Sequence, residues 1–205
     1  MTPLGFYLAR TVRREAPLAA LSMGEAALLS RAAGRRVALV GNARSLADRA
    51  EGAEIDAADL VIRINRAPMP AAASHGTRTD WLALATSLPS ADLARIAPDL
   101  VLWMSPKRKR LPWRVASRAG RFYLHPLPRI AALAARIGAP PTTGLMMIDL
   151  LAGADLARLT LHGFDFFASL SLSGRRGAAQ VPHDFAAERG FVEALAARDA
   201  RLVLR

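Results

Sequence analysis

Two short apolar runs, each followed by an asparagine, constrain the fold of this chain most strongly. Val37–Val40 leads into Gly41-Asn42, and Leu60–Ile64 leads into Asn65. Continuous apolar runs of this length predict strands buried on both faces, as in a parallel sheet covered by helices. Ligands bind such sheets beyond the carboxyl ends of the strands. Because an amide both donates and accepts hydrogen bonds, Asn42 and Asn65 are candidate contacts for a nucleotide.

Each asparagine also has a plainer explanation, because Asn is a common turn former. Because an asparagine follows each of two neighbouring strands, we favour a nucleotide site over two unrelated turns. The same stretch offers two supporting side chains. Ser45 is expected to cap a short helical turn after Asn42. Arg63 is free to meet an anionic group of a ligand, although arginine is so common here that it ranks below the asparagines.

The rest of the chain alternates apolar runs with helix-forming stretches. This pattern indicates an α/β fold: a single Rossmann-like domain with a mostly parallel sheet of about seven strands flanked by helices. We place that domain at residues 34–205, after an N-terminal helical lead-in, residues 1–33. Further strands are predicted at Trp81–Ala85, Leu100–Met104, Phe122–His125, Leu159–His162 and Leu202–Leu204, and helices at Leu88–Ala97, Ile130–Ile137, Thr142–Leu151 and Phe185–Arg198.

Composition narrows the class of protein. Apolar residues make up 52% of the 205 residues, which argues against general disorder. The sequence has no uncharged apolar run of about 18 residues, so no membrane span is predicted. Arginines at positions 10, 13 and 14 interrupt the apolar residues near Met1, where a signal peptide needs a continuous run. With no cysteine, disulfides and thiolate chemistry are excluded. We therefore expect a cytoplasmic protein, with peripheral attachment to the inner membrane as an option.

The formal net charge of +11 suggests acidic partners, although a general habit of using arginine explains it equally well. The loop Lys107–Arg110, between Trp103 and Trp113, suits an anionic membrane or a nucleic acid, or is simply a solvated connection. Leu4, Phe6, Tyr7 and their neighbouring arginines either lie on a membrane surface or pack on the domain.

Two later segments add candidate chemistry. In Pro140-Pro141-Thr142-Thr143-Gly144, the prolines delay a helix whose first turn threonine can cap, and a helix start attracts anions. Ordinary capping is the alternative. His183 precedes the last helix, where a neutral imidazole is a candidate general base. A capping or surface role is its alternative. His75 has no comparable context, His162 is more readily structural, and His125 is a weak candidate at a strand end.

Missing motifs also count. The sequence contains no P-loop, no GxGxxG, no HExxH and no GxSxG. Asp165-Phe166-Phe167 is not a paired-aspartate metal motif. A mechanism without a metal ion is therefore favoured.

Taken together, these segments resemble the sialyltransferase family that contains the animal enzymes and their bacterial relatives. VALVGNARSL, IDAADLVIRINRAP and GTRTD resemble its large motif, and PTTGLMMIDLLAGADLARLTLHGF resembles its small motif. His183 and Glu188 match its very small motif, His-x4-Glu. The order and spacing agree from Val37 to about Arg198.

The resemblance implies a glycosyltransferase A-type variant that moves an acidic sugar from a CMP-sugar to a glycan or glycolipid hydroxyl, with inversion and without a metal or other cofactor. The sugar would be sialic acid or a related keto-sugar acid. By resemblance, Asn42 and Asn65 hold the CMP, and Gly163 allows close approach. His183 is the general base, Glu188 orients its segment, and the donor is met by Thr142, Thr143 and Gly144.

The chain also departs from the animal enzymes. They join the large and small motifs by a disulfide, which this chain must replace by packing. They carry a further histidine between the small motif and the base, which is absent between Gly163 and His183. Arg175, Arg176 or Gln180 would then meet the leaving phosphate. Two alternatives stay open: a non-catalytic CMP- or nucleotide-binding domain, and a basic membrane- or nucleic-acid-binding protein. We expect no nucleic acid as partner.

Overall fold

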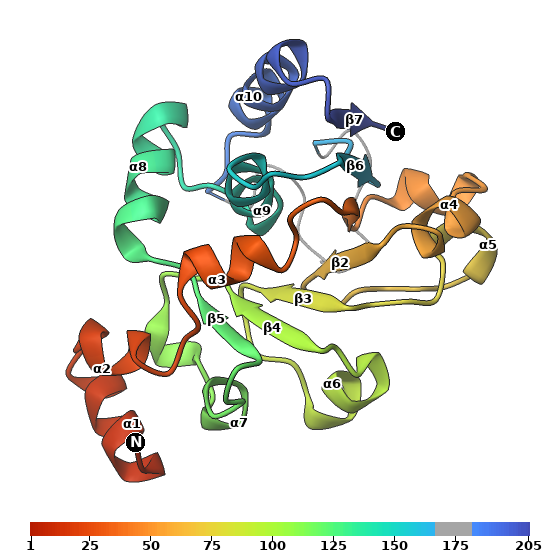
Figure 1. The fold of residues 1–205 in the computed structure, drawn as a ribbon. Coiled ribbons are helices and arrows are strands. Elements are labelled where there is room, and N and C mark those ends of the chain that lie inside the picture. The colour runs from red at the N-terminus through yellow and green to blue at the C-terminus, as the bar shows by residue number, and fades with distance from the viewer. Residues whose placement is uncertain (167–181) are drawn as a thin grey trace.

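A computed structural model describes residues 1–166 and 182–205. Its centre is one sheet of seven strands in the order β5-β4-β3-β2-β1-β6-β7, in which every neighbouring pair is parallel (Figure 1). The sheet confirms the predicted Rossmann-like α/β fold. The strands are β1 (Arg36–Val40), β2 (Leu60–Ile64), β3 (Trp81–Leu84), β4 (Leu100–Trp103), β5 (Phe122–Leu124), β6 (Arg158–His162) and β7 (Leu202–Leu204).

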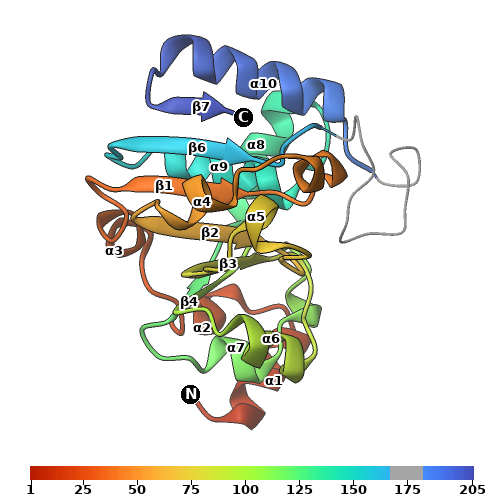
Figure 2. The ribbon, with the colours of Figure 1, turned by 90° about the vertical axis from the view of Figure 1, so that its right-hand side faces the viewer.

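Helices cover both faces of the sheet, which explains why the strands are mostly apolar on both sides rather than alternating (Figure 2). One face carries α3 (Glu25–Ser30), α8 (Leu127–Ile137), α9 (Thr143–Ala152) and α10 (Phe185–Arg198). The other carries α1 (Pro3–Thr11), α2 (Glu15–Ala19), α6 (Ser90–Ile96) and α7 (Trp113–Ala116) over β3, β4 and β5. Beside them, over β1 and β2, lie η1 (Arg44–Asp48), α4 (Gly52–Asp56) and α5 (Ala72–His75), and the short η2 (Arg108–Arg110) follows β4.

The predicted strands are present with boundaries shifted by about one residue, the usual uncertainty of helix and strand ends. Helices α4, α5 and α7 were not predicted, because segments of four or five residues are too short to show a helical period. Phe6, Leu18 and Leu28 anchor the N-terminal helices in the core with no exposed surface. Within the described ranges, no helix combines the length and apolarity needed to cross a membrane.

Candidate active site

The two asparagines link three neighbouring strand ends. Asn42 follows β1, and its Nδ2 donates to the carbonyl oxygen of Ile64 at the end of β2, at 3.3 Å. Asn65 comes next on β2, and its Oδ1 accepts from the backbone N–H of Ala85 after β3, at 3.0 Å. Asn65 has a positive φ of 53°, which asparagine tolerates better than most residues. The turn-forming interpretation therefore applies to Asn65, whose Oδ1 shapes the edge. Its Nδ2 has no partner among the described residues, and the site interpretation stays a prediction.

The sheet reverses its direction of winding at β1, which has β2 on one side and β6 on the other. This is the switch point at which open α/β sheets bind ligands. The strands come very close there: a Cβ on Gly41 would lie 2.3 Å from the carbonyl oxygen of Gly163. Gly163 itself has a φ of +66°, which favours glycine. Two glycines therefore allow the Asn42 segment to lie directly against the end of β6.

Phe164 connects this switch point to the start of α9. A Cβ on Gly144 would lie 2.7 Å from Cε1 of Phe164, so the ring occupies the space that a larger residue would need. Sequence reasoning assigned Gly144 to the donor and did not identify Phe164, although it directly follows Gly163 in the small-motif resemblance. The Phe164 contact is one way in which this cysteine-free chain joins the two motif regions.

Thr142 and Glu188 bind each other closely. The backbone N–H of Thr142 donates to one carboxylate oxygen of Glu188 and its hydroxyl donates to the other, both at 2.7 Å. Thr142 also caps α9 by accepting from the N–H of Leu145 at 3.1 Å. Burial raises the pKa of Glu188, and the bonds from Thr142 oppose that rise. The predicted cap is confirmed, and both polar groups of Thr142 are engaged.

The next two N–H groups of α9, those of Thr143 and Gly144, are the first-turn donors that a helix cannot satisfy internally. No acceptor for either is found in the described part of the chain. Thr143 is itself buried, at 7% exposure. Because they lie at the positive end of a ten-residue helix, these two N–H groups suit an anion.

His183 is fixed by the segment before α9. Its Nδ1 lies 2.7 Å from the carbonyl oxygen of Pro140, and a carbonyl can only accept, so Nδ1 carries the proton. In the neutral ring Nε2 is then the basic nitrogen. The imidazole is partly exposed, and Asp184 behind it caps α10 by accepting from Ala187 N–H at 2.9 Å. His183 therefore has the tautomer that a general base needs.

These contacts join the predicted residues along one edge of the molecule. Asn65, Asn42, Gly163, Gly144, Thr142, Glu188 and His183 follow one another through direct contacts or single intervening residues. Four separate segments of the chain thus meet at the carboxyl edge of the sheet, near β1 and β6. Arg175, Arg176 and Gln180 lie outside the described residues.

Two supporting residues have other roles than predicted. Arg63 is 1% exposed, and its guanidinium donates to the carbonyl oxygens of His75 at 2.6 Å and Arg78 at 2.8 Å. Burial lowers its pKa to about 10. Arg63 is therefore not free to meet a phosphate, because it holds the turn before β3. Ser45 lies inside η1, which has no side-chain cap, and its hydroxyl donates to Asp165 at 3.3 Å.

The remaining histidines are structural in this arrangement. His75 is buried against Ser74, and His162 is buried with its Nδ1 2.7 Å from Glu51. His125 has no exposed surface at the end of β5, and burial, with Arg129 and Arg108 nearby, lowers its pKa to about 3. The weak assignment of His125 to the site is therefore not supported.

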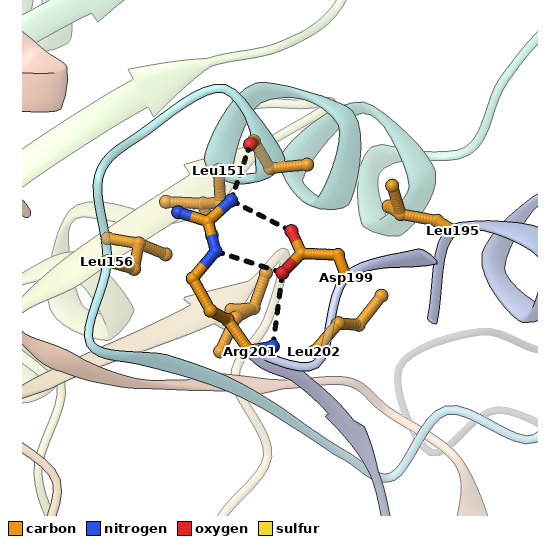
Figure 3. A pocket seen from close by; sticks show the side chains of 8 residues that line it. Leu151, Leu156, Leu195, Asp199, Arg201 and Leu202 are labelled. Atoms are coloured by element: carbon orange, nitrogen blue, oxygen red, sulfur yellow. Dashed lines mark hydrogen bonds and ion pairs between the residues drawn. The ribbon is translucent and has the colours of Figure 1, made fainter. Parts of the chain in front are cut away.

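A recess drawn in Figure 3 lies at the opposite edge, where β6 and β7 begin. It is lined mainly by leucines, and Arg201 closes it by pairing with Asp199 at 2.8 Å. The other guanidinium nitrogen of Arg201 donates to the carbonyl oxygen of Ala154, just after α9, at 2.8 Å. Because Arg201 is satisfied by these partners, we regard the recess as packing space.

A family model decides the assignment. The model of glycosyltransferase family 29 (sialyltransferase) matches residues 6–109, about half of the chain. The chain belongs to the sialyltransferase family. It is accordingly a glycosyltransferase of the CMP-sugar-dependent type. The matched range contains the large-motif resemblance, while the small and very small motifs lie beyond it.

Solved sialyltransferases share the fold. One mammalian sialyltransferase superposes with a TM-score of 0.61 at 20% identity, covering 84% of this chain and 69% of its own. A second, in complex with Gal-beta-1-3GalNAc-ortho-nitrophenol, gives 0.59 at 15% identity, covering 99% and 85%. A comparison with curated proteins gave no match. At these identities the structures establish the fold of this family member.

No group of three or more potential metal ligands occurs among the residues that the structure describes. The possible donors at the carboxyl edge are amides, backbone N–H groups and one imidazole, and Glu188 is engaged by Thr142. This set suits an anionic ligand better than a divalent cation, which prefers several oxygen ligands.

Proposed function

We propose that this family member transfers an acidic sugar, sialic acid or a related keto-sugar acid, from its CMP-activated form to a hydroxyl of a glycan or glycolipid, with inversion. The bond from His183 Nδ1 to the Pro140 carbonyl carries the proposal, because it leaves Nε2 as a base on the same edge as the asparagines and the start of α9. Membership of the family supplies the reaction class.

In the proposed step, the acceptor hydroxyl oxygen forms a bond to the anomeric carbon as the bond from that carbon to the CMP phosphate oxygen breaks. The hydroxyl proton passes to His183 Nε2, and CMP leaves with the bonding electron pair. A single displacement of this kind inverts the anomeric configuration. A well-placed base contributes about 10²–10⁴-fold to such a rate.

The carboxyl edge offers suitable contacts for cytidylate. The N–H groups of Thr143 and Gly144 lie where a helix start stabilises a phosphate, and Asn65 Nδ2 is an additional donor. A departing monophosphate develops less charge than a nucleoside diphosphate, so we propose that these fixed donors replace a metal ion. We keep Arg175, Arg176 and Gln180 as proposed partners of the leaving phosphate, in place of the histidine that this chain lacks.

A thermal-shift comparison of CMP, CDP, UMP and GDP tests the donor site. We expect CMP to raise the melting temperature most, because a ligand that binds only the folded state stabilises it. Equal shifts for all four nucleotides would contradict a cytidylate site. Turnover is measured in parallel with a panel of CMP-sugars and with β-galactosides among the acceptors, since a solved relative is in complex with such a sugar. CMP binding without turnover across the panel would identify the non-catalytic alternative.

A further inference from the structure

Large apolar side chains are exposed together at one end of the molecule. Of the six exposed large hydrophobic residues in the described ranges, five lie within residues 1–12. Leu4 is 80% exposed and Leu8 62%. Soluble proteins commonly expose such residues singly, whereas a contiguous group indicates a surface that contacts something. The five residues are Met1, Leu4, Tyr7, Leu8 and Val12.

Helix α1 is apolar on two opposite sides. Phe6 and Ala9 are buried on one side, where Phe6 packs against the ring of Trp113 at 5.3 Å between centroids. Leu4, Leu8 and Val12 recur every fourth residue on the other side, where they cover no described part of the domain. The first side already anchors the helix, so packing within this chain does not account for the second.

Positive charge lies on α1 and on the segments next to it. Arg10 stacks on the Tyr7 ring at 4.8 Å, Arg13 and Arg14 follow the helix, and η2 packs against α1. Lys109 and Arg110 on η2 are exposed. Neither residues 1–14 nor residues 100–121 contain an aspartate or glutamate. Glu15, the acid that follows residues 1–14 in the sequence, is bound to the buried Arg108 at 2.6 Å.

We propose that this α1 surface, made of the five apolar residues with Arg13, Arg14, Lys109 and Arg110, docks on a bilayer that contains anionic lipid. The apolar side chains would enter the boundary between headgroups and acyl chains while the cations meet lipid phosphates. A nine-residue helix is too short to span a bilayer, so it lies in the plane of the surface. The proposal concerns a surface outside the donor site, so it stands or falls independently of the proposed reaction.

Two other occupants fit less well. A second copy related by two-fold symmetry would bring the same cations of both copies together, with no acid in these segments to compensate. A nucleic acid would match the charge but not the exposed aliphatic side chains. It would also lack stacking partners, because Trp103 has no exposed surface and Trp113 packs on Phe6.

Cosedimentation tests the proposal with vesicles of phosphatidylcholine alone and vesicles in which one third of the lipid is phosphatidylglycerol. We expect binding to the anionic vesicles that weakens as salt is raised. The triple variant Leu4→Ser, Leu8→Ser, Val12→Ser should bind at least tenfold more weakly with an unchanged melting temperature. The pair Lys109→Ala, Arg110→Ala should weaken binding several-fold for each charge removed.

The matched control is the pair Arg158→Ala, Arg198→Ala. It removes the same charge from exposed positions on β6 and α10, at the end of the molecule away from α1 (Figure 2). This control should bind vesicles as the unmodified chain does. Three results would overturn the proposal: no binding to anionic vesicles, binding that the triple variant retains, or a dimer in light scattering that the triple variant dissociates without any vesicle binding. Preferential capture of a single-stranded oligonucleotide by all variants would overturn it as well.

Discussion

Two parts of the carboxyl edge each contain a histidine, and the two histidines differ in exposure. Beyond β5, His125 is fully buried, and the carbonyl oxygen of His125 and the carboxylate of Glu15 both accept from the Arg108 guanidinium at 2.6 Å. Beside β1 and β6, His183 is partly exposed. The first group attaches the N-terminal helix α2 to the sheet, while in the second the His183 imidazole is partly exposed and the first two N–H groups of α9 have no acceptor among the described residues. A histidine at a strand end is therefore informative only together with its exposure and the groups that it already binds.

The largest expected difference between the two regions is catalytic. His183→Ala should reduce transfer by about 10²–10⁴-fold, because the base is lost, while the dissociation constant for CMP stays unchanged. His125→Phe should retain transfer within a few-fold. Initial rates with an active donor and acceptor pair measure both. An active His183→Ala enzyme would refute the assignment of the base.

Packing at the Phe164 contact should be the next most sensitive. Gly144→Ala places a methyl group 2.7 Å from the Phe164 ring, and overpacking of this kind costs about 1–3 kcal/mol of unfolding free energy. Gly190→Ala is the matched control, because its Cβ has no neighbour within 4 Å and alanine favours a helix interior. The melting temperature should fall in Gly144→Ala and rise slightly in Gly190→Ala. Adding Phe164→Leu should partly restore the melting temperature of Gly144→Ala. An unchanged melting temperature in Gly144→Ala alone would contradict the contact.

Glu188 should contribute a similar or smaller amount. Glu188→Ala leaves the partly buried N–H and hydroxyl of Thr142 without their acceptor, which costs about 1–3 kcal/mol. Glu188→Gln keeps one acceptor oxygen, so its melting temperature should lie between those of the unmodified chain and Glu188→Ala. If the pair also positions His183, Glu188→Ala lowers kcat while KM for the donor changes little. Equal melting temperatures and equal rates for the unmodified chain and both Glu188 variants would show that Glu188 has neither a stabilising nor a positioning role.

The effect that is smallest at neutral pH is the contribution of His125, which appears only on acidification. The pKa of His125 is about 3 when folded against an ordinary value of 6.5, so the unfolded chain binds the additional proton between these values. Stability contributed by the neutral ring is complete above pH 6.5 and declines as the pH falls toward 3, by at most about 1.4 kcal/mol per pH unit. His75, whose pKa burial also lowers, adds to this slope. His125→Phe should reduce the acid slope in urea unfolding, and an unchanged slope would contradict the burial argument.

Sequence reasoning located the strands and named candidate site residues that the structure places along one edge of the sheet, because both leave local signals. An apolar run marks a buried strand, and the asparagines, Thr142 and His183 stand at positions where an element starts or ends. Arg63 was misjudged because nothing local shows that carbonyls 12 and 15 residues later hold its guanidinium. The role of Gly144 was incomplete for the same reason, since Phe164 is distant in sequence. Exposure of Leu4 and Leu8 likewise depends on which side of α1 the domain covers.

Binding of CMP to Asn65→Asp tests the central claim most directly. Aspartate keeps the oxygen that accepts from Ala85 N–H and replaces only the Nδ2 donor, so the fold should be retained. Loss of one hydrogen bond to a charged ligand costs about 1.5–3 kcal/mol, and we predict a CMP dissociation constant raised at least tenfold in titration calorimetry. Glu15→Ala, at the other part of the edge, should lower the melting temperature and leave that constant unchanged. Unaltered CMP affinity in Asn65→Asp, or weakened affinity only in Glu15→Ala, would contradict a cytidylate site beside β1 and β2.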